Sequence, residues 1–402
     1  MDKAGPAPLQ FEPYTAAFAA DPYPFYAALR ERAPVFHAAE FGMTFLTRYR
    51  NIFTALTDKR LGRAPLRASV HRSALPAYDR YVRVNLLETE GATHTRLRRL
   101  LAHALSPKRV LGLHEHVQEI ANGLIAKLAP DVEIDFIAQV AEPLPVVVIS
   151  ELLGWPEAER HRLRPWSADI VRLYEQDATD EDAERAESAC REFAKMLDAL
   201  ATERKAVPAD DFISALAALE DDANGLSRDE LISSCMLLLN AGHEATVNAA
   251  GNGLLALLRH PEAMERLRKE PALTGSTVEE MLRYDAPLHL FHRFAYEEIE
   301  IEGHVIPRGA KVGLLYGAAN RDPEAFSEPD RFDIARTPNR HLAFGAATHF
   351  CLGAPLARLE LRTLFGTLLA NTDHLQLREE PEHRPGLVFR GLKHLKVRNK
   401  PL

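Results

Sequence analysis

The sequence predicts a mainly α-helical protein with a small β region, and three observations support this prediction. A helical pattern of apolar residues runs without a break through residues 228–259, well beyond the roughly 8–20 residues of most globular helices. Most of residues 132–220 shows the same helical periodicity. The alternation that is typical of strands is confined to short stretches, and it is clearest after residue 297. We therefore expect a helical body with a few short strands.

Composition narrows the class of protein. Of the 402 residues, 46% are hydrophobic and 26% charged, as in a soluble globular protein with a large core. The formal net charge of −8 speaks against non-specific nucleic-acid binding. No apolar run has the length of a signal peptide or a membrane span. The scattered cysteines Cys190, Cys235 and Cys351 fit a reducing compartment. We expect a cytoplasmic protein that binds neither nucleic acid nor membrane.

Short elements are expected at both ends of the chain. Residues 21–36 predict a turn, a short helix and a strand, which a second strand at residues 44–47 and a helix at residues 49–58 follow. Residues 60–83 are basic and irregular, which is typical of a solvated loop. Residues 388–397 predict a closing hairpin.

A helix that begins near residue 91 carries a pair of polar side chains on one face. Pro107 ends this helix, and its apolar face is formed by Leu97, Leu100, Leu101 and Leu105. His94 and Arg98 are four residues apart and so are neighbours on the helix surface. The simplest interpretation is a surface pair. Positive charge gathers nearby on Arg96, Arg99, Lys108 and Arg109. This stretch is therefore a candidate docking patch for an acidic partner.

The helix predicted over residues 228–259 has small residues along one face of its middle part. They are Ala241, Gly242, Ala245 and Ala249. Small side chains let something flat approach the helix, although close packing of another helix explains them equally well. Glu244 lies in the same apolar stretch, and an interior acid needs either a partner or a task.

The next segments combine a helix, a strand and a hairpin. Residues 278–287 predict a helix in which Glu280 and Arg283 are three apart; on a surface such a pair contributes only about 0.3–0.5 kcal/mol. Pro287 breaks the helix, and residues 288–295 continue as a strand. A hairpin with turns at residues 302–303 and 308–309 follows.

Cys351 lies in a loop of small and turn-forming residues just before a helix that begins near Ala354. A helix N-terminus favours a negative group, so the thiol is expected to ionise more readily than a free one. A thiolate held this way is a good metal ligand, and haem iron accepts one. A buried inert cysteine and a nucleophile paired with His349 are the alternatives. Zinc is disfavoured because no second cysteine lies nearby.

The segment FGAATHFCLG, residues 344–353, resembles the haem-binding loop FGxGxHxCxG of the cytochrome P450 family. The residues that match are Phe344, Gly345, His349, Cys351 and Gly353. Ala347 departs from the pattern because it stands where the second loop glycine is usual, and alanine tolerates positive φ less well.

A second motif, AGHEAT at residues 241–246, is similar to the family's oxygen-activating helix, AGx[DE]T. Ala241, Gly242 and Glu244 match, whereas Ala245 stands where threonine is usual. Thr246 comes one position late, about 100° further around the helix, and is expected to point elsewhere. The resemblance then implies that protons reach bound oxygen through Glu244 and water, or through a polar group of the substrate.

Taken residue by residue, the resemblance implies a single domain over residues 1–402 with the triangular P450 fold. Haem b would lie between the 228–259 helix and the Cys351 loop, with Cys351 on the iron. The haem contacts would be His94, Arg98, Arg293, Phe344, His349 and Gly353. The substrate pocket would include Leu238, Ala241, Leu288, His289, Leu290 and Phe389. A buried structural network would consist of Glu280, Arg283 and Arg331.

The resemblance implies a monooxygenase that inserts one oxygen atom from O2 into a small organic substrate. Electrons would come from a ferredoxin-type partner and its reductase, and the protein is expected to be a monomer. Two alternatives stay open, a non-catalytic haem-thiolate sensor and a peroxide-driven oxygenase. Glu244 in the oxygen-activating helix argues against the peroxide-driven alternative.

Overall fold

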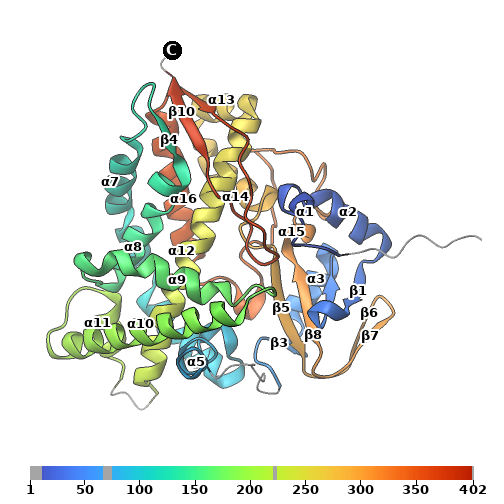
Figure 1. Cartoon of the computed structure of the whole chain (residues 1–402), viewed down its shortest axis with the longest axis vertical. Coiled ribbons are helices and arrows are strands. Elements are labelled where there is room, and N and C mark those ends of the chain that lie inside the picture. The colour runs from blue at the N-terminus through green and yellow to red at the C-terminus, as the bar shows by residue number, and fades with distance from the viewer. Residues whose placement is uncertain (1–10, 67–74, 221–223, 401–402) are drawn as a thin grey trace, which may run out of the picture.

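The computed structural model describes residues 11–66, 75–220 and 224–400, with only the backbone of residues 107 and 108. Its α-helices are α1 (Ala16–Ala20), α2 (Tyr23–Arg32), α3 (Tyr49–Thr57), α4 (Pro76–Tyr81), α5 (Gly91–Ala104), α6 (Pro107–Gly112), α7 (His114–Ile125), α8 (Pro143–Leu153), α9 (Leu163–Arg172), α10 (Asp180–Ala206), α11 (Phe212–Ala217), α12 (Arg228–Arg259), α13 (Pro261–Lys269), α14 (Thr274–Tyr284), α15 (Tyr316–Ala319) and α16 (Ala354–Ala370). Figure 1 shows most helices in one large part, beside a smaller part that holds α1 to α3 and the main sheet. The predicted fold class is confirmed.

The strands are β1 (Val35–Ala38), β2 (Met43–Leu46), β3 (Leu61–Gly62), β4 (Glu133–Asp135), β5 (Leu290–Ala295), β6 (Ile299–Ile301), β7 (His304–Ile306), β8 (Lys311–Leu315), β9 (His374–Leu377) and β10 (Lys396–Lys400). Within the described ranges they form sheets of order β1-β2-β8-β5-β3, β4-β10-β9 and β6-β7. Strands β2 and β8 run parallel, while β5 and β8 are antiparallel. The closing hairpin predicted over residues 388–397 is wrong, because β10 pairs instead with β4 and β9.

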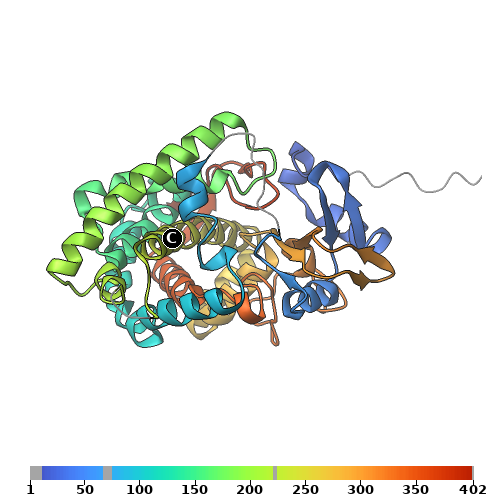
Figure 2. The same ribbon diagram turned by 90° about the horizontal axis from the view of Figure 1, so that it is seen from below.

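Helix α12 passes through the middle of the helical part (Figures 1 and 2) and is 32 residues long. A capping box starts it, in which the Ser227 side chain accepts the Glu230 N–H and the Glu230 carboxylate accepts the Ser227 N–H. Two glycines mark its closest contacts. A Cβ at Gly251 would lie 2.5 Å from Cδ1 of Ile137 in the π-helical turn Ile137–Ala141, and one at Gly253 would lie 2.7 Å from Sδ of Met281. Larger residues do not fit there without displacing buried side chains.

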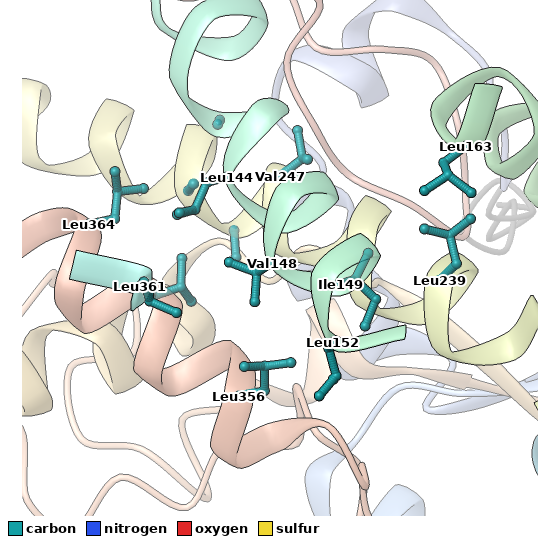
Figure 3. Close-up of a cluster of buried hydrophobic side chains, with 14 of the residues drawn as sticks. Leu144, Val148, Ile149, Leu152, Leu163, Leu239, Val247, Leu356, Leu361 and Leu364 are labelled. Carbon is teal, nitrogen blue, oxygen red and sulfur yellow. The ribbon is translucent and has the colours of Figure 1, made fainter. Parts of the chain in front are cut away.

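The apolar core joins α12 to α8 and α16. Figure 3 shows side chains from the three helices facing one another. The members labelled on these helices are Leu144, Val148, Ile149, Leu152, Leu239, Val247, Leu356, Leu361 and Leu364, and all are buried. Since α16 begins three residues after Cys351, this packing holds the loop of that cysteine against the helical body. Among the described helices, none combines the length and apolar character that a membrane crossing requires.

A buried ion-pair network fixes the segment that leads into the Cys351 loop. Glu280 and Arg283 are fully buried and bond through two oxygen–nitrogen pairs of 2.8 Å. The third member is Arg336, whose Nε lies 3.1 Å from Glu280 Oε2. The prediction that Arg331 is this member is wrong. The Arg331 side chain is exposed and pairs with Glu328, and it is the Arg331 carbonyl that accepts hydrogen bonds from Arg283 and Arg336.

Candidate active site

One cavity of about 1150 Å³ lies between the middle of α12 and the Cys351 loop. The six haem-contact residues predicted above and Cys351 all line it, although they come from three separate segments. Leu238, Ala241, Leu288, Leu290 and Phe389 line it as well. His289 does not line the cavity. Its side chain points to the other side of the backbone, where its Nδ1 lies 3.0 Å from the Tyr26 hydroxyl. That part of the predicted pocket is corrected, because successive residues of an extended strand point to opposite sides.

The Cys351 sulfur faces this cavity and is approached by the backbone N–H groups of Gly353 and Ala354. Burial nevertheless raises the pKa of the Cys351 thiol, and these N–H groups and Arg98 offset that rise only in part. The expectation that the helix N-terminus makes this thiol more acidic is therefore wrong for the protein alone. A bound metal cation would deprotonate a coordinating thiol outright. The raised pKa favours the role of a metal ligand over that of a free nucleophile.

The loop before Cys351 keeps its tight shape despite Ala347. Gly345 has φ 66° and Ala347 has φ 55°, so both lie in the left-handed region. The Cys351 N–H donates to the Phe344 carbonyl at 2.9 Å and closes the loop. Ala347 therefore adopts the glycine-like conformation of the family pattern at the cost of some backbone strain, on the order of 1 kcal/mol.

Four hydrogen-bond donors line the cavity, and within the described ranges only one of them has a carboxylate partner. They are His94, Arg98, Arg293 and His349. His94 is buried, its Nε2 has no hydrogen-bond partner in the described part of the chain, and burial lowers its pKa to about 4. Arg98 donates to the Phe350 carbonyl at 2.7 Å, and the buried Arg293 donates to the His292 carbonyl at 3.1 Å. Neither arginine has an ion-pair partner among the residues that the structure describes. Only His349 has one, with its Nε2 2.8 Å from Glu90.

These features would fit a planar group that carries two carboxylates and whose metal takes a sulfur ligand. The orphaned His94 nitrogen and the two unpaired guanidinium groups are suited to propionates, and the Cys351 sulfur is suited to iron. The donor set thus matches haem b.

Replacing either cavity arginine should loosen the haem. Charge-assisted hydrogen bonds are worth roughly 1.5–3 kcal/mol each, so Arg98→Ala and Arg293→Ala should each release haem about tenfold faster. Haem transfer to excess apomyoglobin measures this rate. Arg99→Ala is the matched control, since Arg99 neighbours Arg98 on α5 but is exposed and does not line the cavity. Equal rates in all three variants and the wild type would contradict the assignment.

On the opposite side, α12 presents Ala241, Ala245 and Thr246 to the cavity. The expectation that Thr246 points elsewhere is wrong, because it lines the cavity together with Ala245. Glu244 does not line the cavity; its Oε1 accepts from Arg384 at 2.8 Å and from Asn248 at 3.4 Å. Glu244 therefore forms an ion pair with Arg384 of the C-terminal segment and is not part of the cavity wall.

The sequence analysis missed one acid, Glu360 of α16. It is buried, lines the cavity and makes no hydrogen bond with any residue in the described ranges. Burial raises its pKa to about 8. A signal was present, because Glu360 is four residues from both Leu356 and Leu364 and so interrupts an apolar helix face.

Comparisons with known proteins agree with this geometry. The family model described as Cytochrome P450 matches residues 172–392. The "Polyketide biosynthesis cytochrome P450 PksS" of Bacillus subtilis is 35% identical over 404 residues, 97% of this chain and 98% of that protein. The "6-deoxyerythronolide B hydroxylase" of Saccharopolyspora erythraea is 38% identical over 400 residues, 95% of this chain and 97% of that protein. A solved structure of P450BioI with an acyl carrier protein carrying hexadec-9Z-enoic acid has a TM-score of 0.90 and 34% identity, covering 96% of this chain and 100% of that one.

Proposed function

Because this chain belongs to the cytochrome P450 family and is a haem-thiolate monooxygenase, we propose that its substrate is a bulky, mostly apolar molecule with a polar group placed next to Ala245. The cavity supports this proposal most directly. Haem b would fill part of its volume of about 1150 Å³, and the lining also includes many aliphatic and aromatic residues outside the predicted haem contacts, among them Leu86, Leu238, Leu288 and Phe389. Pockets of this character bind apolar ligands and orient them with few polar contacts.

The names of two relatives point to the same class of molecule. One acts in polyketide biosynthesis and the other hydroxylates a compound named 6-deoxyerythronolide B. We propose a polyketide-like ring or chain that carries hydroxyl groups. The sensor alternative has no support from these comparisons, since relatives are named as hydroxylases and monooxygenases.

When bound, the haem supplies the iron at which O2 is activated, with a thiolate ligand that favours O–O cleavage. Cys351 would provide that thiolate, while His94, Arg98, Arg293 and His349 would hold the propionates. The apolar wall excludes water and holds the substrate against α12.

O–O cleavage needs two protons, and the methyl side chain of Ala245 can deliver none. Thr246 of the same helix lines the cavity beside Ala245. We therefore propose that a hydroxyl of the substrate takes the place of the missing threonine and that Thr246 resupplies its proton. Glu244, held by Arg384, orients this part of α12.

For the electron donor, we propose a ferredoxin-type protein that docks beside the Cys351 loop. The cationic patch is narrower than the sequence suggests, because Arg96 pairs with Glu230 and Arg109 with Asp210. The Lys108 side chain lies outside the described residues. Arg99 remains exposed, and the exposed Phe350 lies next to the sulfur ligand. The monomeric state and the cytoplasmic location are part of the same proposal, and the free thiols of Cys190 and Cys235 agree with the location.

The experiment compares hydroxylated and deoxygenated macrolactones as substrates. Compounds are first screened for a Soret shift on binding, and product is then tested for an oxygen atom from 18O2. If the substrate assists, removing its hydroxyl nearest the iron should cut product per electron at least about tenfold and raise peroxide, while binding persists. Ala245→Thr should partly restore product from the deoxy analogue.

A variant of Thr246 separates its role from that of the substrate hydroxyl. Thr246→Val keeps the shape of the side chain and removes its hydroxyl, so product per electron should fall while substrate binding persists. Equal coupling with the deoxy analogue would overturn substrate assistance, whereas unchanged coupling in Thr246→Val would overturn only the role of Thr246.

A further inference from the structure

Glu175 joins the segment between α9 and α10 to a separate part of the cavity wall. Its carboxylate accepts three consecutive backbone N–H groups, with Oε2 2.9 Å from the Leu387 nitrogen and Oε1 3.0 Å from the Val388 and Phe389 nitrogens. The Tyr174 ring stacks on the Phe389 ring at a centroid distance of 6.4 Å. Tyr174, Glu175, Val388 and Phe389 all line the cavity.

The wall that Glu175 holds is itself tied to the start of β5. Phe389 forms a bridge with Leu288, and the His289 N–H donates to the Val388 carbonyl at 2.8 Å. The positions of three cavity residues, Leu288, Val388 and Phe389, therefore depend on one another. A change at Glu175 acts on this whole side of the cavity.

The Glu175 carboxylate bonds to backbone amides and not to a cationic side chain. Burial raises the pKa of Glu175, and the three N–H donors act in the opposite direction by stabilising the charged form. The carboxylate has no ion-pair partner within the described residues. Close approach also depends on Gly386, because a Cβ there would lie 2.9 Å from Glu175 Oε1. The contact is specific, and it can be opened without stranding a buried cation.

A second glutamate, Glu187 of α10, makes the same kind of contact with another segment. Glu187 Oε2 accepts the Ala77 and Tyr78 N–H groups at 3.0 Å, and Tyr78 of α4 lines the cavity. The unit formed by α9, α10 and their connection is thus fastened by one carboxylate to each of two walls. These two carboxylate contacts are separate in the chain and can be removed one at a time.

We propose that Glu175 is a positioning residue for the monooxygenation, whose carboxylate fastens the α9–α10 connection onto residues 387–389 and so closes the cavity around the substrate. Opening this contact frees Phe389 and widens the path between the cavity and solvent. The proposal depends on the P450 reaction but not on which substrate class the cavity takes.

The test uses the haem-loaded protein and two readouts. Hydrogen exchange read by mass spectrometry follows the peptide that contains residues 387–389, and stopped-flow absorption follows 4-phenylimidazole binding to the iron. In Glu175→Ala, exchange at residues 387–389 should be at least about tenfold faster, since three amides lose their acceptor. The association and dissociation rates of 4-phenylimidazole should both rise about tenfold, with a much smaller change in Kd.

Two further variants make the result specific. Glu175→Gln keeps one oxygen acceptor at the same length and should fall between the wild type and Glu175→Ala, which also covers the case that the alanine variant does not fold. Glu187→Ala should speed exchange at residues 76–81 and leave residues 387–389 at the wild-type rate. Unchanged exchange at residues 387–389 in both Glu175 variants would overturn the proposal. So would faster exchange there without any change in the 4-phenylimidazole rates.

Discussion

Cys351→Ser is expected to abolish the strongly red-shifted Soret band that thiolate-ligated haem shows when reduced and bound to carbon monoxide. Serine is a far poorer ligand for iron than thiolate, and no second thiol lines the cavity among the described residues. Loss should be complete rather than partial, because Cys351 is the cysteine on the cavity wall. The measurement is the reduced carbon monoxide difference spectrum of purified protein reconstituted with haem.

The chain offers its own controls for this experiment. Cys190 and Cys235 are buried free thiols away from the cavity wall, and burial raises the pKa of both. Cys190→Ala and Cys235→Ala should keep the full band, at some cost in stability from the small voids they leave. A serine variant at position 351 that keeps the band would refute the assignment of the ligand.

Arg336→Ala should destabilise the protein about as severely as Arg283→Ala. Both guanidinium groups contact the fully buried Glu280, and removing one leaves the remaining charges uncompensated, at roughly 3–5 kcal/mol. Most of each variant should be recovered without haem or as aggregate. The measurement is the urea midpoint of the soluble fraction, followed by haem absorbance and far-UV circular dichroism.

Arg331→Ala is the matched control for this network. The Arg331 side chain is 63% exposed and pairs with Glu328, whereas the Arg336 side chain is 9% exposed. The backbone carbonyl of residue 331, which does take part, survives the substitution. The change in unfolding free energy should stay below about 0.5 kcal/mol. If Arg331→Ala were as damaging as Arg336→Ala, the structural assignment of the third arginine would be wrong.

Local patterns predicted the helical architecture well. The limits of α12 agree with residues 228–259, because a capping serine precedes an unbroken apolar period and a His-Pro pair ends it. The hairpin of β6 and β7 was also predicted, from an alternating pattern and a turn at Glu302 and Gly303, and both turn residues take positive φ in the structure. Signals of this kind lie within a few residues of the feature that they determine.

What escaped prediction depends on contacts between distant parts of the chain. Arg331 and Arg336 are only five residues apart, and only the folded structure shows that the Arg336 side chain is the one that contacts Glu280. The partner of Glu244 is Arg384, 140 residues away. The bonds from Glu175 end on backbone amides, which have no signature in the sequence. The Cys351 loop was easier because its chemistry is contained within ten consecutive residues, although burial reversed the expected direction of its pKa.

The two glycines in the C-terminal half of α12 also fix how far Ala245 lies along the helix axis from a point of close packing. Gly251 and Gly253 meet side chains so closely that the helix cannot slide along its own axis without a clash. Ala245 is six residues before Gly251, so at 1.5 Å per residue it is held about 9 Å from that fixed point. A slip by one helical turn, about 5.4 Å, would bring a different pair of residues to the oxygen side of the cavity. The glycines thus fix the axial position of the helix, and a contact about 9 Å away determines that Ala245 and Thr246 are the residues that line this part of the cavity.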